Sequence, residues 1–156
     1  MSIESITAAT VGETLHSLAK GRANPDTPFV SLAQVTARLR DDKLLDSPEL
    51  RLLALERVFR DAITDELVRM LEQRGDDRVA MIRDGAVLDG PVSPSSREIE
   101  AWAALHARFV AMRRGPANDL GRMFGMTGRT FYRRLERGYQ LLADVLRNRE
   151  YDALGS

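Results

Sequence analysis

The sequence predicts an all-helical protein. Apolar residues recur at steps of three and four over several long stretches, which is the period of α-helices packed on one face. Residues that start helices stand just before two of these stretches, and a strand-like pattern is confined to about residues 79–88. We therefore expect an N-terminal helical association region over 1–74, a strand or linker segment over 75–95, and a further group of helices over 96–150.

The length and composition exclude several classes of site. A chain of 156 residues can bury a hydrophobic core without a disulfide or metal. It has no cysteine and only two histidines, His16 and His106, so a zinc finger, a thiol nucleophile and a disulfide framework are excluded. Neither a Ser-His-Asp set, nor paired carboxylates, nor a phosphate-binding loop can be recognised. We expect a protein that is not an enzyme and that uses no cofactor or metal.

Two helices are expected before residue 45. The first is short, carries Ile3, Ile6, Leu15 and Leu18 on one face, and ends at Gly21, where the loop "GRANPDTP" follows. The second ends near the sequence "DDK", and its apolar face comprises Phe29, Leu32, Val35 and Leu39.

A third, longer helix starts at "DSPEL" and extends to about Arg74. Ser47 is expected to cap it, Pro48 to occupy its first position and Glu49 to favour its positive end. Its apolar face comprises Leu52, Leu55, Phe59, Ile63, Leu67, Met70 and Leu71. A face this long must pack on the preceding helix, on another subunit or on both, so we expect it to form the surface of a homodimer.

The segment "GDDRVAMIRDGAVLDGPVSP" breaks the helical period. "VAMI" and "AVL" on either side of "RDG" are compatible with a short hairpin or with one strand and a loop, and "DGPVSPSS" is typical of a linker. The spacing of its four aspartates does not fit a calcium-binding loop. From Ser95, spaced as a capping box with Glu98, another helix follows, with Trp102 and His106 expected as core residues.

The stretch "DLGRMFGMTGRTFYRRLERG", residues 119–138, has the residue types of a helix-turn-helix in order. A small residue is needed where the two helices touch, here Gly121, and a glycine where the chain turns, here Gly125. The positions expected to face inward are Leu120, Phe124, Met126, Phe131 and Leu135. Thr127 is expected to cap the second helix, and Gly128 is expected on its exposed front. The helix that contains Trp102 would lie behind the pair as its third member.

Charge favours DNA as the ligand of this unit. Residues 1–95 carry 12 Lys and Arg against 16 Asp and Glu, whereas residues 96–156 carry 11 against 7. Arginine pairs with the guanine edge and with phosphates, while hydroxyls and tyrosine bind phosphates or thymine methyls. The residues expected to contact bases are Thr127, Arg129, Tyr132, Arg133 and Arg137. Those expected to contact the DNA backbone are Arg113, Arg114, Arg122, Thr130 and Arg134.

Two known families resemble parts of the chain. "GMTGRTFYRRLERG" resembles the second half of the helix-turn-helix in region 4 of sigma factors. Over about residues 50–140 the layout resembles the Mor/C family of phage transcription activators. "AITDELVRML" then corresponds to the dimerisation helix, "RVAMI" to the strand and "DLGRMFGMTGRTFYRRL" to the DNA-reading unit. The resemblance implies an activator that binds promoter DNA as a dimer and contacts RNA polymerase.

The sequence therefore predicts a cytoplasmic, phage-type transcription regulator that binds double-stranded DNA. With no secretory signal and no apolar run long enough to cross a bilayer, we expect no membrane association. Two alternatives stay open. One is a packaging subunit that recognises DNA as a small terminase does, and the other is a structural helical protein whose basic helix binds an acidic protein. In the second case "RTFYRRLERGYQLL" would be an ordinary amphipathic helix with solvated arginines.

Overall fold

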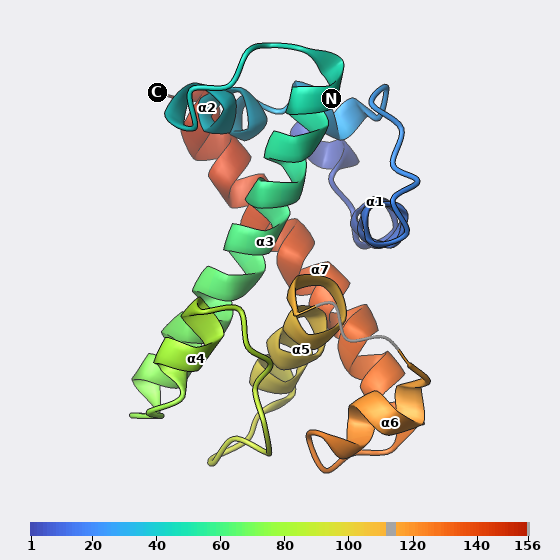
Figure 1. Cartoon of the computed structure of the whole chain (residues 1–156), viewed down its shortest axis with the longest axis vertical. Helices are drawn as coiled ribbons and strands as arrows, with labels where there is room; N and C mark the ends of the chain where they lie inside the picture. Colours follow the sequence, from blue (N-terminus) through green and yellow to red (C-terminus); the bar gives the residue numbers. More distant parts are fainter. Residues whose placement is uncertain (112–114, 156) are drawn as a thin grey trace. The chain divides into compact units, whose positions relative to one another are not determined.

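Every regular element in the described part of the chain is helical. The computed structural model describes residues 1–111 and 115–155 (Figure 1). The predicted all-helical class is therefore confirmed, and the segment left open as a strand or hairpin near 79–88 instead begins with a helix, Val79–Arg83. A short apolar run cannot be assigned to a helix or a strand from its periodicity alone, which is why "VAMI" was ambiguous.

The chain divides into two compact units. The first combines Met1–Ala62 with Tyr139–Ser156, and the second is Ile63–Gly138. The sequence had suggested a linear division at residues 74 and 95, whereas both ends of the chain contribute to the first unit. Two long helices, α3 (Pro48–Gln73) and α7 (Gly128–Leu154), supply residues to both units.

The first unit contains the predicted N-terminal helices. In chain order its elements are η1 (Ile3–Ser5), α1 (Ala8–Ala19), η2 (Pro28–Ser31), α2 (Ala33–Asp41), the start of α3 and the end of α7. Ser47 caps α3 as expected, because its hydroxyl accepts a hydrogen bond from the Leu50 amide at 3.2 Å. The helix expected from Phe29 onwards is divided in two, since Leu32 has an extended backbone between η2 and α2.

Glu150 provides the cap that α2 lacks in its own sequence. Its carboxylate accepts hydrogen bonds from the backbone amides of Ala33, at 2.7 Å, and Gln34, at 3.1 Å. The side chain is only 3% exposed, so these bonds compensate the cost of removing a charged group from water. A residue 117 positions away in the sequence thus fixes where α2 begins.

The apolar face of α3 is buried within the chain. Leu55, Ile63, Leu67 and Leu71 are each 0% exposed, and Phe59 meets Phe29 edge to face with ring centroids 5.6 Å apart. Intramolecular packing therefore covers these residues, which was one of the alternatives for this face. A homodimer stays a prediction, and it would need a surface other than these buried side chains.

The second unit contains the remaining helices. These are the end of α3, α4 (Val79–Arg83), α5 (Arg97–Leu105), the π-helical turn η3 (His106–Val110), α6 (Ala117–Arg122) and the start of α7. Ser96, not Ser95, caps α5, since its hydroxyl accepts from the Ile99 amide at 3.2 Å. Trp102 and His106 are 3% and 0% exposed, as expected for core residues.

Candidate nucleic-acid interface

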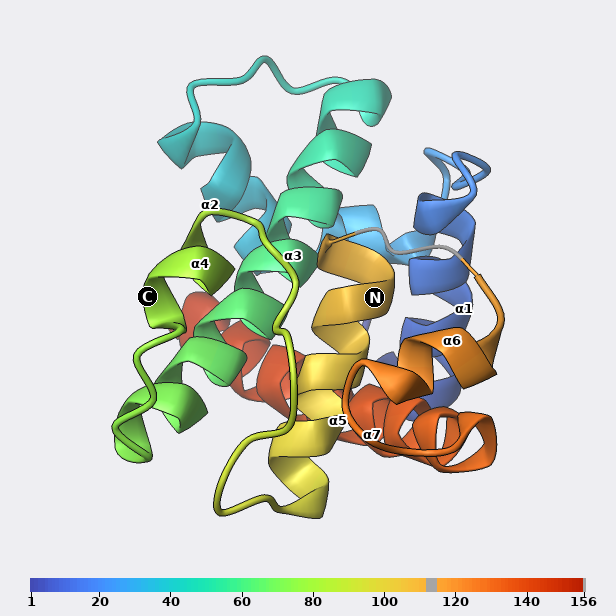
Figure 2. The same ribbon diagram turned by 60° about the horizontal axis from the view of Figure 1, so that its bottom comes forward.

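Two helices and a tight connection occupy the segment that was predicted to be a helix-turn-helix. Helix α6 ends at Arg122, α7 begins at Gly128, and Figures 1 and 2 show α6 beside the first turns of α7. Four of the five positions predicted to face inward are buried, namely Leu120, Phe124, Phe131 and Leu135, whereas Met126 is half-buried. The Phe124 and Phe131 rings are nearly parallel, with centroids 6.4 Å apart. Apolar packing therefore fixes the two helices against each other, as the sequence pattern predicted.

Gly121 and Gly125 have the two roles expected of them. A Cβ at Gly121 would lie 2.6 Å from the carbonyl oxygen of Met126, which is too close for any side chain. Gly125 has a φ of +70°, a conformation that residues with a side chain seldom adopt. The first glycine therefore permits the close contact, and the second permits the turn.

Gly128 was expected on the exposed face, and that expectation is wrong. It is buried, and a Cβ there would lie 2.1 Å from the Asn118 side-chain oxygen. Thr127, directly before it, caps α7 as expected: its hydroxyl oxygen accepts from the Thr130 amide at 3.1 Å. The start of α7 thus packs closely against the start of α6.

Helix α5 lies behind α7 as the expected third member. At Gly138 a Cβ would meet Leu105 Cγ at 2.6 Å and the Ala101 carbonyl oxygen at 3.2 Å. Only a glycine allows α5 and α7 to approach this closely. The front of α7 is consequently the side turned away from α5.

The five residues predicted to contact bases are all exposed: Thr127, Arg129, Tyr132, Arg133 and Arg137. Tyr132 is 61% exposed, which is high for an aromatic side chain. Within residues 1–111 and 115–155, neither Arg129 nor Arg133 makes an ion pair, whereas Arg137 lies 3.5 Å from Glu98. The structure therefore places a cationic and aromatic face on the first turns of α7.

The residues predicted to contact the DNA backbone differ in their exposure and in their partners. Arg122 is highly exposed, with Asp119 at 3.6 Å. Thr130 is half-buried and accepts a hydrogen bond from the Thr127 hydroxyl. Arg113 and Arg114 lie outside the described residues.

Arg134 requires a correction. Its guanidinium Nε donates to Glu100 at 3.0 Å, and both side chains are largely buried. This arginine joins α7 to α5 and is not directed outward, because a carboxylate on the packed helix satisfies it. Helical periodicity predicts which face of its helix a residue occupies. It does not predict which side chain of a neighbouring helix contacts that residue.

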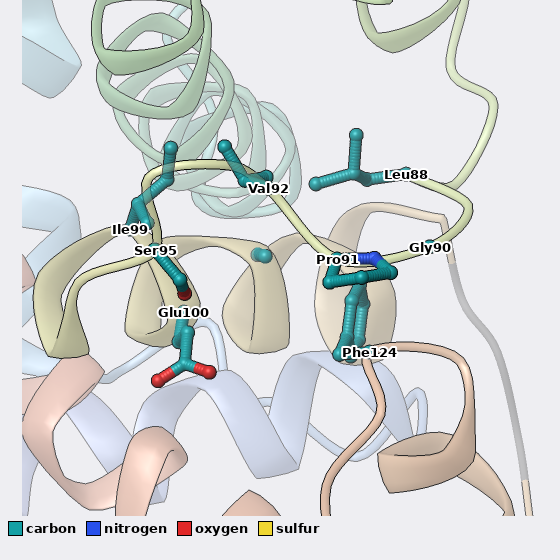
Figure 3. A pocket seen from close by; sticks show the side chains of 9 residues that line it. Leu88, Gly90, Pro91, Val92, Ser95, Ile99, Glu100 and Phe124 are labelled. Carbon is teal, nitrogen blue, oxygen red and sulfur yellow. The ribbon is translucent and has the colours of Figure 1, made fainter. Parts of the chain in front are cut away.

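The segment expected to be a linker supports the turn. The Gly90 amide donates to the Met123 carbonyl at 3.1 Å, which ties the segment to the connection between α6 and α7. Leu88, Pro91, Val92 and Phe124 line one small apolar hollow (Figure 3). Sequence reasoning missed this role, because a loop rich in proline and glycine has no periodicity that reveals its contacts.

Arg78 fixes the same segment through a further set of hydrogen bonds. Its guanidinium donates to the Asp76 carboxylate and to the backbone carbonyls of Asp89 and Pro91. The hydrogen bonds from Arg78 hold the pKa of Asp76 below its usual value. Asp76 therefore takes part in folding the loop that supports the turn.

Comparisons with known proteins identify no relative of this chain. No protein family, curated protein or solved structure matches the chain. Among the described residues, no helix is both long enough and apolar enough to cross a membrane. The candidate interface therefore rests on its own geometry.

Proposed function

We propose that this chain binds double-stranded DNA with sequence preference, through α6 and the first turns of α7. The observation that carries the proposal is the division of roles along residues 119–138. Glycines and apolar residues are buried where the helices meet, while Arg129, Tyr132 and Arg133 project outward from α7. An exposed helix of this size and charge suits the major groove, which admits one α-helix.

The chemistry of the exposed residues suits base edges and phosphates. Arg129 and Arg133 can each donate two hydrogen bonds to the O6 and N7 atoms of guanine. Tyr132 lies between them in sequence and offers a hydroxyl and an apolar ring. We expect Arg122, which is exposed on α6, to bind the backbone and so to fix the register without reading sequence.

On an ordinary amphipathic surface helix, nothing would favour the separation of paired arginines from unpaired arginines on different faces. Here the arginine that packs toward α5 has a carboxylate partner, Glu100, whereas Arg129 and Arg133 lie on the open face without an ion pair in the described structure. Cations concentrated on one exposed face favour a polyanionic ligand. A role in transcription regulation, suggested by the resemblance to phage activators, is the biological setting that we propose for this binding.

The test is a selection of bound sequences from random duplex DNA, followed by titrations of single variants. We expect Arg129→Ala and Arg133→Ala to weaken binding to the selected sequence by about 1–3 kcal/mol for each lost base contact. Arg122→Ala should weaken binding equally on all sequences. Arg83→Ala is the matched control, since Arg83 is an exposed arginine paired with Glu72 on another part of the second unit.

The selection also tests the oligomeric state. Two half-sites about one helical turn apart would support a homodimer, which must then use a surface other than the buried face of α3. Failure of the wild-type protein to bind duplex DNA at low salt would contradict the proposal. Binding to an acidic protein in place of DNA would favour the structural alternative.

A further inference from the structure

The front of α7 carries a carboxylate among its exposed cationic and aromatic residues. Gly138 packs against α5, so the front of α7 is the side opposite Gly138. A helix has about 3.6 residues per turn, so residues at steps of three and four share one face. Such steps place four exposed residues on the front: Arg129, Tyr132, Arg133 and Glu136.

The fold makes no use of the Glu136 side chain. Glu136 follows Arg133 by three positions, a spacing at which glutamate and arginine on a helix can form an ion pair. In the part of the chain that the structure describes, Glu136 nevertheless makes neither an ion pair nor a side-chain hydrogen bond. Glu100 and Glu150, by contrast, each connect α7 to another helix. The carboxylate of Glu136 is therefore available to a ligand.

A carboxylate on this front distinguishes base edges from phosphates. An ionised glutamate only accepts hydrogen bonds, so it cannot pair with phosphate oxygens, and the two negative charges repel each other. In the major groove, glutamate accepts a hydrogen bond from the N4 amino group of cytosine. Where the facing base edge offers no donor, the carboxylate loses water without gaining a bond. Glu136 on the front of α7 thus favours one kind of base pair over the others.

We propose that Glu136 is a specificity-determining residue that selects cytosine at one position of the bound DNA sequence. This inference rests on the proposed function. Arg129 and Arg133 attract any duplex through its phosphates, whereas Glu136 weakens binding unless a cytosine faces it. The hydrogen bond on the matched sequence and the repulsion on unmatched sequences change affinity in opposite directions. Both effects therefore increase the preference for the matched sequence.

The experiment compares wild-type protein with Glu136→Ala on duplexes of known sequence. One is the duplex recovered by selection, and each of the others carries one replaced base pair. We expect Glu136→Ala to lower the discrimination at one C·G pair by about five- to tenfold, the effect of one hydrogen bond to a base edge. Discrimination at the other positions should change by less than about twofold, because separate base pairs contribute nearly independently.

Salt dependence separates base reading from general repulsion. Repulsion between an exposed carboxylate and the phosphates is screened as the ionic strength rises, whereas a hydrogen bond within the groove is screened much less. We therefore expect the loss of discrimination at the C·G pair to persist when the salt concentration is raised.

Glu13→Ala is the matched control for the change in charge. Glu13 is also an exposed glutamate within a helix, α1, and it makes no ion pair with any described residue. The proposed function does not use α1, so Glu13→Ala should leave the discrimination at every position unchanged. Urea unfolding should show that Glu136→Ala is as stable as the wild type, as expected for an exposed helical position.

The outcomes distinguish this inference from the proposed function. If the wild type binds duplex DNA but Glu136→Ala leaves the discrimination unchanged at every position, the role of Glu136 is overturned and the proposed function stands. An equal gain in affinity on every duplex has the same consequence, since it indicates repulsion by the glutamate alone. Absence of duplex binding by the wild-type protein overturns both proposals.

Discussion

The two parts of α7 use their charged residues differently. In residues 139–154, Arg147 donates to the Ile6 carbonyl and pairs with Asp144, and Glu150 is buried as the cap of α2. In residues 128–138, Arg129 and Arg133 are exposed and make no ion pair within the described structure. One continuous helix therefore carries charges that hold the fold together at its end and charges that face outward at its start.

This difference shows that arginine content alone does not identify a binding surface. Both parts of α7 contain arginines, but a nearby carboxylate or carbonyl determines whether each one is available to a ligand. Arg134 is the clearest case, because it lies beside Arg133 in sequence and yet pairs with Glu100. A partner combined with burial, and not the number of charges, separates structural arginines from candidate contacts.

The largest expected effect comes from removing Glu150, the buried residue near the end of α7 that caps α2. Glu150→Ala leaves the Ala33 and Gln34 amides without their acceptor, so we expect the free energy of unfolding to fall by about 3 kcal/mol. Urea unfolding measures this loss. Asn148→Ala, at an exposed position on the same helix, is the control and should change stability by less than about 0.5 kcal/mol. Equal stability of the two variants would show that Glu150 does not hold α2.

The next largest effect is expected at the close contact between α6 and the connection that leads into α7. A Cβ at Gly121 would lie 2.6 Å from the Met126 carbonyl oxygen, so Gly121→Ala must displace backbone. We expect a loss of about 2 kcal/mol in unfolding free energy and weaker duplex binding, since the two helices can no longer meet in register. Gly155→Ala is the control, because a Cβ there has no neighbour nearer than 3.6 Å. Full stability and binding of Gly121→Ala would contradict the close contact.

Sequence reasoning predicted several local features of the fold well. The caps Ser47 and Thr127, the roles of Gly121 and Gly125, and the buried position of Phe131 all follow from residue type and spacing. Each depends on residues within a few positions of one another. Such features can be predicted from the sequence alone, because they depend only on the residue types at neighbouring positions.

Contacts between distant residues were not predictable in the same way. The pairing of Glu100 with Arg134, the burial of Gly128 against Asn118 and the cap that Glu150 gives to α2 each join elements that only the fold brings together. The apolar face of α3 was recognised correctly, but periodicity could not say whether the same chain or another subunit covers it. The sequence thus predicts which faces are buried, whereas the partners of those faces require the structure.

The smallest expected effect tests the distinction between Arg134 and its neighbours. Arg134→Ala removes a largely buried ion pair, so we expect the free energy of unfolding to fall by about 1 kcal/mol. Because this arginine is satisfied by Glu100, the slope of log duplex affinity against log salt concentration should stay at the wild-type value. Arg122→Ala provides the contrast: stability should be nearly unchanged, while the slope becomes shallower by about 0.9 for one lost phosphate contact. If Arg134→Ala reduced the slope by the same amount, Arg134 would be a backbone contact after all, and the division between paired and outward-facing arginines on α7 would fail at that position.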